Sequence, residues 1–414
     1  MKRVVIIGGG ISGLCSAYYL VKEGCDVTVL DQNDCDTGAS FINAGYITPS
    51  HFIPLAAPGI ITQGIKWMFN SSSPFYIKPR WDMEFFKWAL LFKSSAKASK
   101  VKNALPVLKE LNLKSRGLYE DMLASNDFNF HYERKGVLMA YCSEKAEEEE
   151  HEVAEKAISE GLEVSILSSG ELREIQPVFS DKVKGAVHYK CDAHMTPNHF
   201  MKQLKDWLKS QGVDLRLGQK VEGFTVKEQK IASVKTNNDV FEADDFVLAS
   251  GSWTSELATS LGLHIPIQGG KGYSMDVKRF TGITLPTILV DARMAVTPME
   301  GFTRFAGTME FSGNNNVVSK NRVEALAKAV KTHYQDVEIG SDEMNSATSG
   351  LRPVSPDGLP YIGKTSKFKN LTVAAGHAMM GWSLGPITGK LVTQEVIGAG
   401  KMVDIAPLSP ERFN

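Results

Sequence analysis

Apolar and polar positions at the start of this chain predict a strand, a helix and a second strand. An uninterrupted apolar run at residues 4–7 predicts a strand that is buried on both faces. The glycine-rich residues 8–13 follow, then a helical run, then a second apolar run at residues 27–30 that ends at Asp31. This order is typical of a βαβ unit.

The glycine-rich turn has the chemistry of a dinucleotide-binding site. In the pattern Gly-x-Gly-x-x-Gly, Gly8 makes the tight turn, Gly10 lets the backbone approach a pyrophosphate, and Gly13 lets helix and strand pack closely. The helix N-terminus offers unpaired N–H groups to the phosphates. Asp31 is placed to accept hydrogen bonds from a ribose. A signal peptide is the alternative for such an apolar start, but no small-residue cleavage site follows the run.

The periodicity of the remaining chain predicts several further elements, and a segment rich in proline and aromatic residues lies at 46–100. Thr196 and Pro197 supply an N-cap and a first-turn proline. The predicted helices lie at 104–125, at 144–160, after Thr196, at 320–335 and after Gly385. The predicted strands lie at 135–141, 213–217, 219–226, 230–236, 239–242, 245–251 and 371–375.

A strand ending in Ala249-Ser250-Gly251 and a second glycine-rich turn at 376–385 return the chain to the sheet where it began. We therefore predict a discontinuous, Rossmann-like nucleotide-binding domain with an inserted substrate domain. Glycines alone do not separate NAD from FAD. The turn at 376–385 favours FAD, because it would bring a helix N-terminus to the flavin's pyrimidine side, where reduction builds negative charge. Close packing is the alternative role for these glycines. The predicted nucleotide-binding segments are 1–45, 196–265 and 346–414, and the substrate-domain segments are 46–195 and 266–345.

Composition narrows the function classes. A length of 414 residues suggests two domains, and a net charge of −1 argues against nucleic-acid binding. No apolar run reaches the ~18 residues of a membrane span. Five cysteines without Cys-x-x-Cys spacing indicate neither a disulfide framework nor a zinc site, and they fit a reducing, cytoplasmic compartment. We predict no metal, and we interpret His194 and His199 as ordinary histidines.

Segments outside the glycine fingerprint carry a more specific signal. They read ASFINAG at 39–45, AAPG at 56–59, GIKWMF at 64–69, PI at 266–267 with KGYS at 271–274, GLRP at 350–353, PDG at 356–358 and GHAMMGW at 376–382. With these motifs, nearly the whole chain resembles the D-amino-acid oxidase superfamily, most closely its bacterial D-amino-acid dehydrogenase branch.

The resemblance implies an α/β plus α+β fold in which the substrate domain is built on a mainly antiparallel sheet. It implies FAD-dependent oxidation of a D-amino acid, with hydride transfer from Cα to flavin N5 and hydrolysis of the imino acid to a 2-oxo acid and ammonia. Electrons would pass to a quinone or another non-oxygen acceptor. Relatives that tether the flavin use a C-terminal cysteine, and none lies beyond Cys191, so the implied FAD is noncovalent. The candidate cofactor-binding residues are Gly8, Gly10, Ile11, Ser12, Gly13, Asp31, Gln32, Ala39, Ser40, Asn43, Ala44, Gly45, Val221, Ser250, Gly251, Gly376, His377, Met379, Met380 and Gly381.

The reaction needs a cation for the substrate carboxylate more than it needs acid–base groups. A planar arginine can bind both carboxylate oxygens. Arg352 in Gly-Leu-Arg-Pro matches the arginine of the family, although a surface or domain-bridging ion pair is its alternative role. Arg304 and Arg293 are further candidates for the carboxylate. Tyr273 and His51 are candidate substrate-binding residues.

Two departures from the family pattern leave the substrate pocket open. Ala378 replaces a glycine of the Gly-His-Gly turn, and the stretch 291–298 lacks the tyrosines of the oxidase branch. A related flavoenzyme acting on D-proline, hydroxy-D-proline, sarcosine or glycine is one alternative, and a noncatalytic flavoprotein is another. The aromatic and basic stretch 65–93 is either a peripheral contact with the inner face of a membrane or a lid over the flavin. The sequence leaves open the preferred amino acid, the electron acceptor and the oligomeric state.

Overall fold

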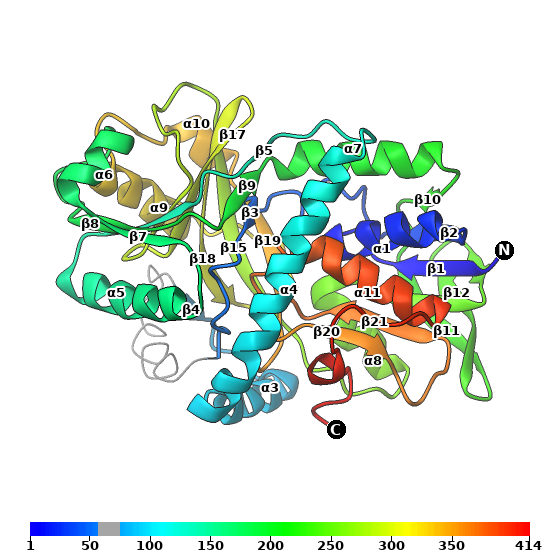
Figure 1. Cartoon of the computed structure of the whole chain (residues 1–414). Helices are drawn as coiled ribbons and strands as arrows, with labels where there is room; N and C mark the ends of the chain where they lie inside the picture. The colour runs from blue at the N-terminus through cyan, green and yellow to red at the C-terminus, as the bar shows by residue number, and fades with distance from the viewer. Residues whose placement is uncertain (57–74) are drawn as a thin grey trace.

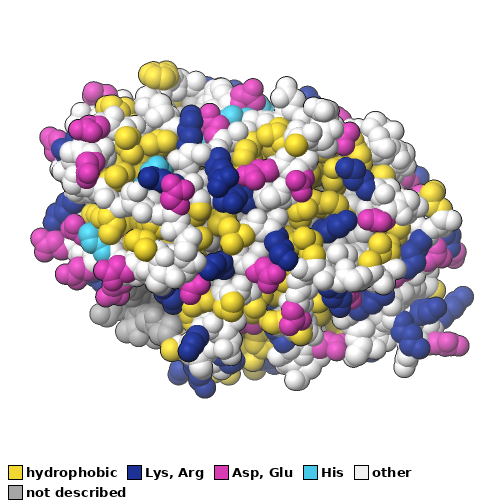
Figure 2. Space-filling view, viewed as in Figure 1, with side chains coloured by type: hydrophobic (Ala, Val, Ile, Leu, Met, Phe, Trp, Pro, Cys, Tyr) yellow, Lys and Arg dark blue, Asp and Glu magenta, His cyan; other side chains and the backbone are white. Residues whose placement is uncertain are grey.

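Two large sheets organise the molecule, as seen in a computed structural model of the chain (Figure 1). The structure describes residues 1–56 and 75–414. A six-stranded sheet lies on the right of the view, a nine-stranded sheet lies on the left, and the long helix α4 crosses between them. Figure 2 shows basic and acidic side chains interspersed over this face, as expected for a net charge of −1.

The six-stranded sheet explains the apolar run at the start of the chain. Val4 and Ile6 pack on one face of the sheet, and Val5 and Ile7 pack on the other. Because successive side chains of a strand point to opposite faces, a strand covered on both sides must be apolar throughout. Its pairs are parallel except β20–β21. In spatial order the sheet contains β10 (Asp214–Arg216), β2 (Asp26–Leu30), β1 (Arg3–Ile7), β14 (Asp245–Leu248), β21 (Leu371–Ala375) and β20 (Tyr361–Lys364).

Helices cover one face of this sheet, and a small antiparallel sheet covers the other. The helical layer contains Leu14, Leu108, Phe200 and Leu391, one from each of its four helices. The opposite layer packs Ile231 and Val234 against the sheet. The helices are α1 (Ile11–Lys22), α4 (Ala98–Ala124), α7 (Pro197–Ser210) and α11 (Gly385–Ile397). The other layer contains β11 (Val221–Lys227), β12 (Lys230–Thr236), β13 (Val240–Glu242) and α8 (Thr254–Ser260), which follows the 3-10 turn η1 (Gly251–Trp253).

The nine-stranded sheet is mainly antiparallel, so the fold class predicted from the sequence is confirmed. Among the described strands of this sheet, only the pairs β16–β6 and β18–β4 are parallel. Its order is β19 (Thr348–Val354), β15 (Gln268–Val277), β18 (Phe302–Phe311), β17 (Met294–Met299), β16 (Thr287–Leu289), β6 (Val137–Tyr141), β8 (Gly185–Tyr189) and β7 (Val164–Ser168), with β4 (Phe75–Ile77) also beside β18. The predicted segment boundaries remain a prediction, and β19, assigned to the nucleotide-binding domain, pairs with β15 in this sheet.

Shorter elements complete the second half of the molecule. Helix α9 packs Leu326 and Val330 against Phe305 of the sheet. A small sheet, in the order β3, β9, β5, begins with β3 directly after the segment 39–45. These elements are β3 (Tyr46–Ile47), β9 (Ala193–Met195), β5 (Tyr132–Glu133), α3 (Met83–Ser95), α5 (Glu144–Ser159), α6 (Ser169–Ile175), α9 (Lys320–His333), α10 (Ser341–Asn345) and the 3-10 turn η2 (Ala406–Leu408).

Most predicted elements lie within a few residues of their expected positions, but two differ for clear reasons. Helix α4 begins at Ala98, six residues before the predicted start, and continues through Pro106. The buried side chains of Val101, Leu105 and Leu108 offset the lost hydrogen bond at the proline. Strand β14 ends at Leu248 instead of residue 251, because the chain turns at Gly251, where φ is +56°.

Helices α1 and α11 cross at a glycine. A Cβ atom on Gly389 would lie 2.4 Å from the carbonyl carbon and oxygen of Cys15, so only glycine permits this approach. Gly385, one turn earlier, would bring its Cβ 2.6 Å from Ile11. The position of α11 against α1 therefore depends on the absence of side chains at these two positions.

We predict that Gly389→Ala lowers the free energy of unfolding by about 1–3 kcal/mol, because the added methyl group forces the two helices apart. Urea denaturation measures this change. Gly117→Ala is the matched control, since it lies in helix α4 with no atom within 4 Å of its new Cβ. It should stabilise the protein by about 0.5–1 kcal/mol. Equal effects of the two substitutions would contradict the account of the crossing.

Candidate functional site

A cavity of about 1520 Å³ lies between the two sheets. One end is lined by the glycine-rich turn and Asp31, and the other end by Arg352 and His377. Small-ligand pockets usually measure about 300–1,000 Å³. The cavity therefore has room for an extended cofactor together with a substrate.

The N-terminus of α1 forms the glycine-rich end of the cavity. The first amide groups of a helix lack a carbonyl one turn earlier, so they are available to a phosphate. The Ile11 amide donates to the Ser40 Oγ at 3.0 Å, which ties the segment 39–45 to this helix. Asp31 accepts hydrogen bonds from the amides of Gly9 at 2.7 Å and Asn33 at 2.8 Å. Because a carboxylate has about four acceptor positions, Asp31 can still accept from ribose hydroxyls.

Three of the predicted cofactor-binding glycines lie behind the cavity wall and shape it. A Cβ on Gly13 would lie 1.9 Å from the Gly8 carbonyl oxygen, as expected for close packing of helix and strand. A Cβ on Gly45 would lie 2.2 Å from the Met195 oxygen, and one on Gly376 would lie 2.5 Å from the Tyr361 ring. The other predicted residues line the cavity: Gly8, Gly10, Ile11, Ser12, Asp31, Gln32, Ala39, Ser40, Asn43, Ala44, Val221, Ser250, Gly251, His377, Met379, Met380 and Gly381.

Arg304 holds the cavity wall and does not offer its charge to a ligand. It is buried, and its Nε and Nη2 donate to the two carboxylate oxygens of Asp276, each at 2.8 Å. Its Nη1 donates to the main-chain oxygens of Phe41 at 3.2 Å and Asn43 at 2.9 Å. The guanidinium therefore anchors the segment 39–45. Arg293, the other alternative, lies at a turn with φ of +50° and contributes to the cavity wall.

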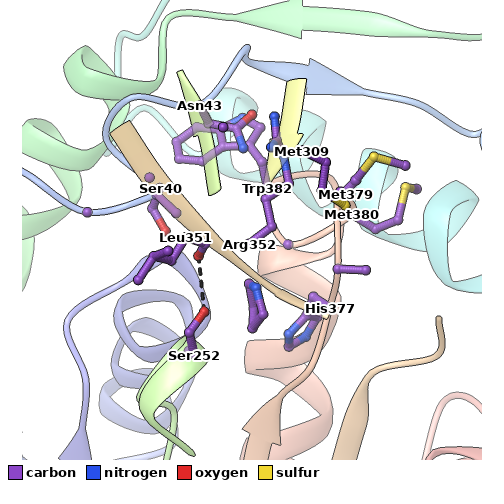
Figure 3. Close-up of a pocket in the computed structure, with 18 of the residues that line it drawn as sticks. Ser40, Asn43, Ser252, Met309, Leu351, Arg352, His377, Met379, Met380 and Trp382 are labelled. Carbon is purple, nitrogen blue, oxygen red and sulfur yellow. Dashed lines mark hydrogen bonds between the residues drawn. The ribbon is translucent and has the colours of Figure 1, made fainter. Parts of the chain in front are cut away.

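Arg352 lies at the centre of the other end of the cavity (Figure 3). Its Nη1 donates to the Thr308 carbonyl at 2.9 Å. No carboxylate of the described residues forms an ion pair with it, and burial lowers the pKa of Arg352 to about 10, so it stays a cation at neutral pH. A Cβ on Gly272 would lie 2.2 Å from Nη1, so the guanidinium rests directly on the backbone of β15. The arrangement leaves Arg352 facing the cavity as a cation without an ion-pair partner among the described residues.

The turn after β21 is attached to the strand that carries Arg352. The Ala378 amide donates to the Pro353 oxygen at 2.8 Å. Burial lowers the pKa of His377 to about 4, and its Nε2 lies 2.9 Å from the Thr388 Oγ1. Ala378, which replaces the glycine of the family pattern, has a left-handed φ of +49°, at a cost of about 1 kcal/mol. Its methyl group packs in a cluster with Phe85, which offsets part of this cost.

Tyr273 does not point toward Arg352. The residue contributes to the cavity wall, but its ring packs in the core between β15 and α9. Its hydroxyl donates to the Glu310 carboxylate at 2.7 Å. Since neighbouring side chains of a strand point to opposite faces, Tyr273 faces away from the side on which Gly272 meets Arg352. The contact of Tyr273 with a substrate therefore stays a prediction, for a residue whose hydroxyl is already bonded to Glu310.

His51 lines the cavity and belongs to a chain of polar groups that the sequence did not reveal. Its Nδ1 lies 3.1 Å from the Ser50 Oγ, which donates to the buried Asp192 carboxylate at 2.5 Å. The Ser50 amide also donates to Asp192 at 3.0 Å. Burial lowers the pKa of His51 to about 4 and raises the pKa of Asp192 to about 7. Ser50 and Asp192 are 142 residues apart, so no local motif signals the contact.

Comparisons with known proteins agree with this geometry. A family model described as FAD dependent oxidoreductase matches residues 3–395. A D-amino acid dehydrogenase of Helicobacter pylori is 30% identical over 393 residues, which cover 94% of this chain and 94% of that protein. A D-amino acid dehydrogenase of Vibrio atlanticus is 30% identical over 427 residues and covers 99% and 100% of the two chains. The crystal structure of glycine oxidase from Geobacillus kaustophilus has a TM-score of 0.79 at 22% identity over 100% of both chains, which shows a shared fold.

We predict that Asp192 makes stability fall as the pH rises. Its pKa rises from the ordinary 3.8 to about 7 in the folded protein, so folding takes up a proton between these values. The stability of the wild type relative to Asp192→Asn should therefore decrease from pH 4 to pH 7, by at most about 1.4 kcal/mol per pH unit, and then level off.

Denaturation of both proteins at several pH values measures this difference. Asp244→Asn is the control, because the Arg3 amide lowers the pKa of this exposed carboxyl and the relative stability should change with pH in the opposite direction. A difference for Asp192→Asn that does not depend on pH would contradict the buried proton.

Proposed function

The chain belongs to the FAD dependent oxidoreductase family, and from this premise we propose that it is a D-amino acid dehydrogenase. The family relationship and the relatives named D-amino acid dehydrogenase establish FAD-dependent amine oxidation as its reaction class. The proposal for D-amino acids as substrates is supported by those relatives, at 30% identity, and by one observation in the cavity, the unneutralised Arg352.

Arg352 supports an amino acid as the substrate because it supplies the missing partner for a carboxylate. A planar guanidinium can donate two parallel hydrogen bonds to the two oxygens. In the cavity its charge is partly desolvated, which makes a carboxylate contact stronger than it would be in water. Gripping both oxygens would also fix the Cα atom in one position, which is the main contribution a protein makes to a cofactor-driven reaction.

The residues from the glycine-rich end to the Arg352 end of the cavity fit FAD. The α1 N-terminus with Ser12 would hold the pyrophosphate, Asp31 the ribose, and the segment 39–45 with Met379–Gly381 the ring. FAD supplies the hydride acceptor when it is bound. We propose that it is bound noncovalently, since the only cysteine lining the cavity is Cys35, beside Gly9 and Asp31 at the ribose end, among the residues that the structure describes.

We propose that His51 handles the amino group. Its imidazole is neutral at physiological pH, so it can accept a hydrogen bond from the substrate nitrogen. Ser50 and Asp192 behind it can accept or donate a proton in turn. We therefore assign His51 the task of holding the amine, which must lose its proton before a hydride can leave Cα.

Cyclic and secondary amino acids such as D-proline, hydroxy-D-proline or sarcosine carry the same carboxylate, so Arg352 alone does not separate them from primary D-amino acids. The names of the relatives at 30% identity favour the primary D-amino acids. A noncatalytic flavoprotein would have no use for an unneutralised cation at the ring end of the cavity.

The sequence left two roles open for the stretch that includes helix α3, a lid over the flavin and a contact with a membrane, and we propose that the helix combines them. Its inner face packs Phe85 and Trp88 over the cavity, and the Trp88 indole donates at 2.9 Å to the oxygen of Val354, two residues after Arg352. Its outer side exposes Leu90 (69%), and Trp81 just before the helix is 97% exposed. The lysines Lys87, Lys93 and Lys97 are exposed beside them. Residues 65–74 of the predicted contact stretch lie outside the described residues.

We further propose that this outer side rests on an anionic lipid surface and brings the flavin close to a membrane quinone that accepts the electrons. Among residues 1–56 and 75–414, no helix has both the length and the apolar character needed to cross a bilayer. Exposed aromatic and aliphatic side chains flanked by lysines are typical of a helix that lies in the interface. Apolar and basic side chains occur together at the lower edge of Figure 2, where α3 lies in Figure 1.

We predict that Arg352→Leu retains FAD but raises KM for the D-amino acid by roughly 30- to 5,000-fold, since losing a desolvated charge partner costs about 2–5 kcal/mol. Steady-state kinetics with a soluble electron acceptor measure this effect, and the flavin absorbance of the purified protein reports FAD. The KM of Arg352→Lys should lie between those of the wild type and Arg352→Leu, because lysine keeps the charge but cannot bind both carboxylate oxygens in the bidentate way. Arg216→Leu, at an exposed arginine of β10, is the control. An unchanged KM in Arg352→Leu would refute the assignment.

For the membrane contact, we predict that the double substitution Trp81→Ser and Leu90→Ser reduces binding to anionic vesicles by at least about tenfold, because it removes two apolar side chains from the interface. Co-sedimentation at low and high salt measures binding, and high salt should weaken it in the wild type. Phe280→Ser is the matched control, since Phe280 is 95% exposed and lies away from α3, in the loop after β15. Equal binding of wild type and double variant would contradict this contact.

A further inference from the structure

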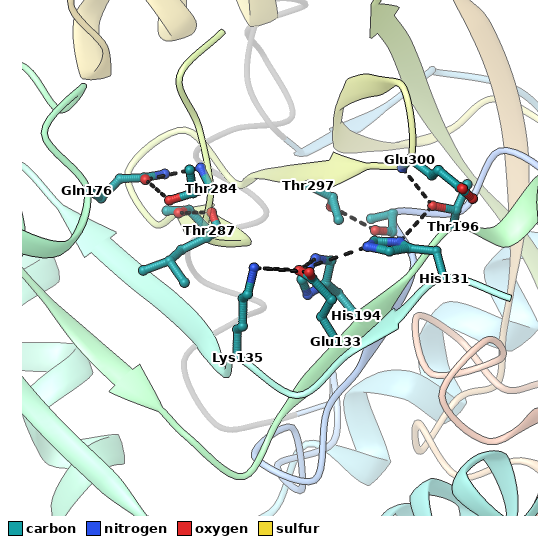
Figure 4. Close-up of polar contacts among 12 residues, drawn as sticks. His131, Glu133, Lys135, Gln176, His194, Thr196, Thr284, Thr287, Thr297 and Glu300 are labelled. Atoms are coloured by element: carbon teal, nitrogen blue, oxygen red, sulfur yellow. Dashed lines mark hydrogen bonds and ion pairs between the residues drawn. The ribbon is translucent and has the colours of Figure 1, made fainter. Parts of the chain in front are cut away.

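Two histidines and a glutamate converge at the edge of the small sheet β3-β9-β5 (Figure 4). The Nε2 of His194 lies 3.4 Å from Oε2 of Glu133, and the Nε2 of His131 lies 3.9 Å from the same oxygen. Glu133 of β5 is the register partner of His194 on β9. One potential ligand atom from each of the three residues lies within 4.8 Å of the others.

His194 is the unusual member of this group. Its side chain is 0% exposed, and the contact of its Nε2 with Glu133, at 3.4 Å, is not a well-formed hydrogen bond. The Pro298 carbonyl is a hydrogen-bond acceptor for the ring, and burial lowers the pKa of His194 to about 4. A buried nitrogen whose hydrogen bond is poorly formed is costly to retain, and a bound ion would satisfy the nitrogen that faces Glu133.

His131 is oriented as a ligand would be. Its Nδ1 lies 2.9 Å from the Thr196 Oγ1, which also accepts from the Glu300 amide at 3.0 Å. In metal sites the second ring nitrogen of a ligating histidine is usually held by such a contact, which directs the first nitrogen at the ion. The two rings are 5.5 Å apart and inclined by 76°, so both can approach one point without stacking.

We propose that His131, Glu133 and His194 form a binding site for a zinc-class divalent metal ion. Imidazole nitrogen and carboxylate oxygen are ligands that Zn²⁺ accepts at about 2.0–2.2 Å, which places neighbouring ligand atoms roughly 3.3 Å apart in a tetrahedron. The distance of 3.4 Å between His194 and Glu133 matches this spacing, and the distance of 3.9 Å between His131 and Glu133 is only slightly longer. His131 and Glu133 are partly exposed, so water can occupy the fourth position.

Lys135 competes with the metal for Glu133. Its Nζ lies 3.0 Å from Oε1 and 2.9 Å from Oε2 of the carboxylate. The lysine side chain is half exposed, so it can move into solvent when an ion binds. Removal of its charge should therefore strengthen metal binding, whereas it would weaken a cluster whose only role is an ion pair.

The site lies next to the cavity wall. His194 is the register partner of Tyr46 on β3, directly after the segment 39–45, and the Met195 amide donates to the Gly45 oxygen at 2.9 Å. An ion that joins β5 to β9 would therefore stiffen the strand behind this wall. A bound metal should raise the thermal unfolding temperature of the protein, because it binds the folded chain only.

A second group, Cys142, Asp291 and His333, also brings potential ligand atoms together. It is the weaker candidate because both Asp291 oxygens are in use. One accepts from the Cys142 amide at 2.8 Å, and the other accepts from the Ser143 hydroxyl at 2.5 Å. This group supplies a control, since a thiolate ligand gives Co²⁺ a spectrum different from that of a nitrogen and oxygen site.

The experiment uses the full-length, FAD-loaded protein after removal of any affinity tag and treatment with EDTA. Zn²⁺ is titrated calorimetrically, and Co²⁺ is added separately and followed by visible absorption. We expect one Zn²⁺ per chain, a Co²⁺ spectrum without a thiolate band, and displacement of Co²⁺ by Zn²⁺. Glu133→Gln and His131→Ala should each weaken binding by at least about tenfold, since even outer-shell partners contribute about 10–100-fold.

Lys135→Met should bind more tightly than the wild type, which keeps the test informative if a ligand variant fails to fold. His264→Ala, at an exposed histidine, and Cys142→Ser should bind like the wild type. The proposal is overturned if the wild type binds neither ion, if Glu133→Gln and His131→Ala bind with unchanged affinity, or if Cys142→Ser abolishes binding.

Discussion

The positive charge of Arg352 is the constraint around which the cavity is arranged. Transfer of a charge from water into a protein interior costs several kcal/mol unless a partner restores the lost interactions. Here a single carbonyl, that of Thr308, accepts from the guanidinium. Thr308 itself has a left-handed φ of +68°, and Gly272 is kept free of a side chain so that the guanidinium can lie against the backbone. The fold thus maintains a cation that, in the proposed function, a substrate carboxylate would complete.

The same constraint links the two sheets. Arg352 lies on β19 of the nine-stranded sheet, and the turn after β21 of the six-stranded sheet is bonded to that strand through Ala378 and Pro353. The Ser252 hydroxyl also donates to the Leu351 oxygen at 3.3 Å, as Figure 3 shows. Because both contacts meet at one strand, they fix the six-stranded sheet relative to the Arg352 end of the cavity. The 39–45 wall is held separately, by hydrogen bonds from the Arg304 guanidinium.

The sequence predicts the parts of this molecule that depend on neighbours in the chain. The glycine turn, the buried first strand and the motif around Arg352 are local, and each is found within a few residues of its predicted position. The direction of the Tyr273 ring could not be predicted, because alternation along a strand decides which residues share a face but not which face meets the cavity. Asp192 and the cluster of His131, Glu133 and His194 could not be predicted, since their partners come from separate strands and loops.

Anaerobic reduction of the bound flavin tests the central claim most directly. The purified protein is mixed without oxygen with a D-amino acid, its L-enantiomer, or the primary amine that lacks only the carboxylate, and the flavin absorbance is followed. We predict bleaching by the D-amino acid alone. The amine lacks the carboxylate that Arg352 must hold, and the L-enantiomer, held by the same carboxylate and amine contacts, would direct its Cα hydrogen away from the flavin. Failure of every D-amino acid to bleach the flavin, or equal bleaching by the amine, would contradict the account.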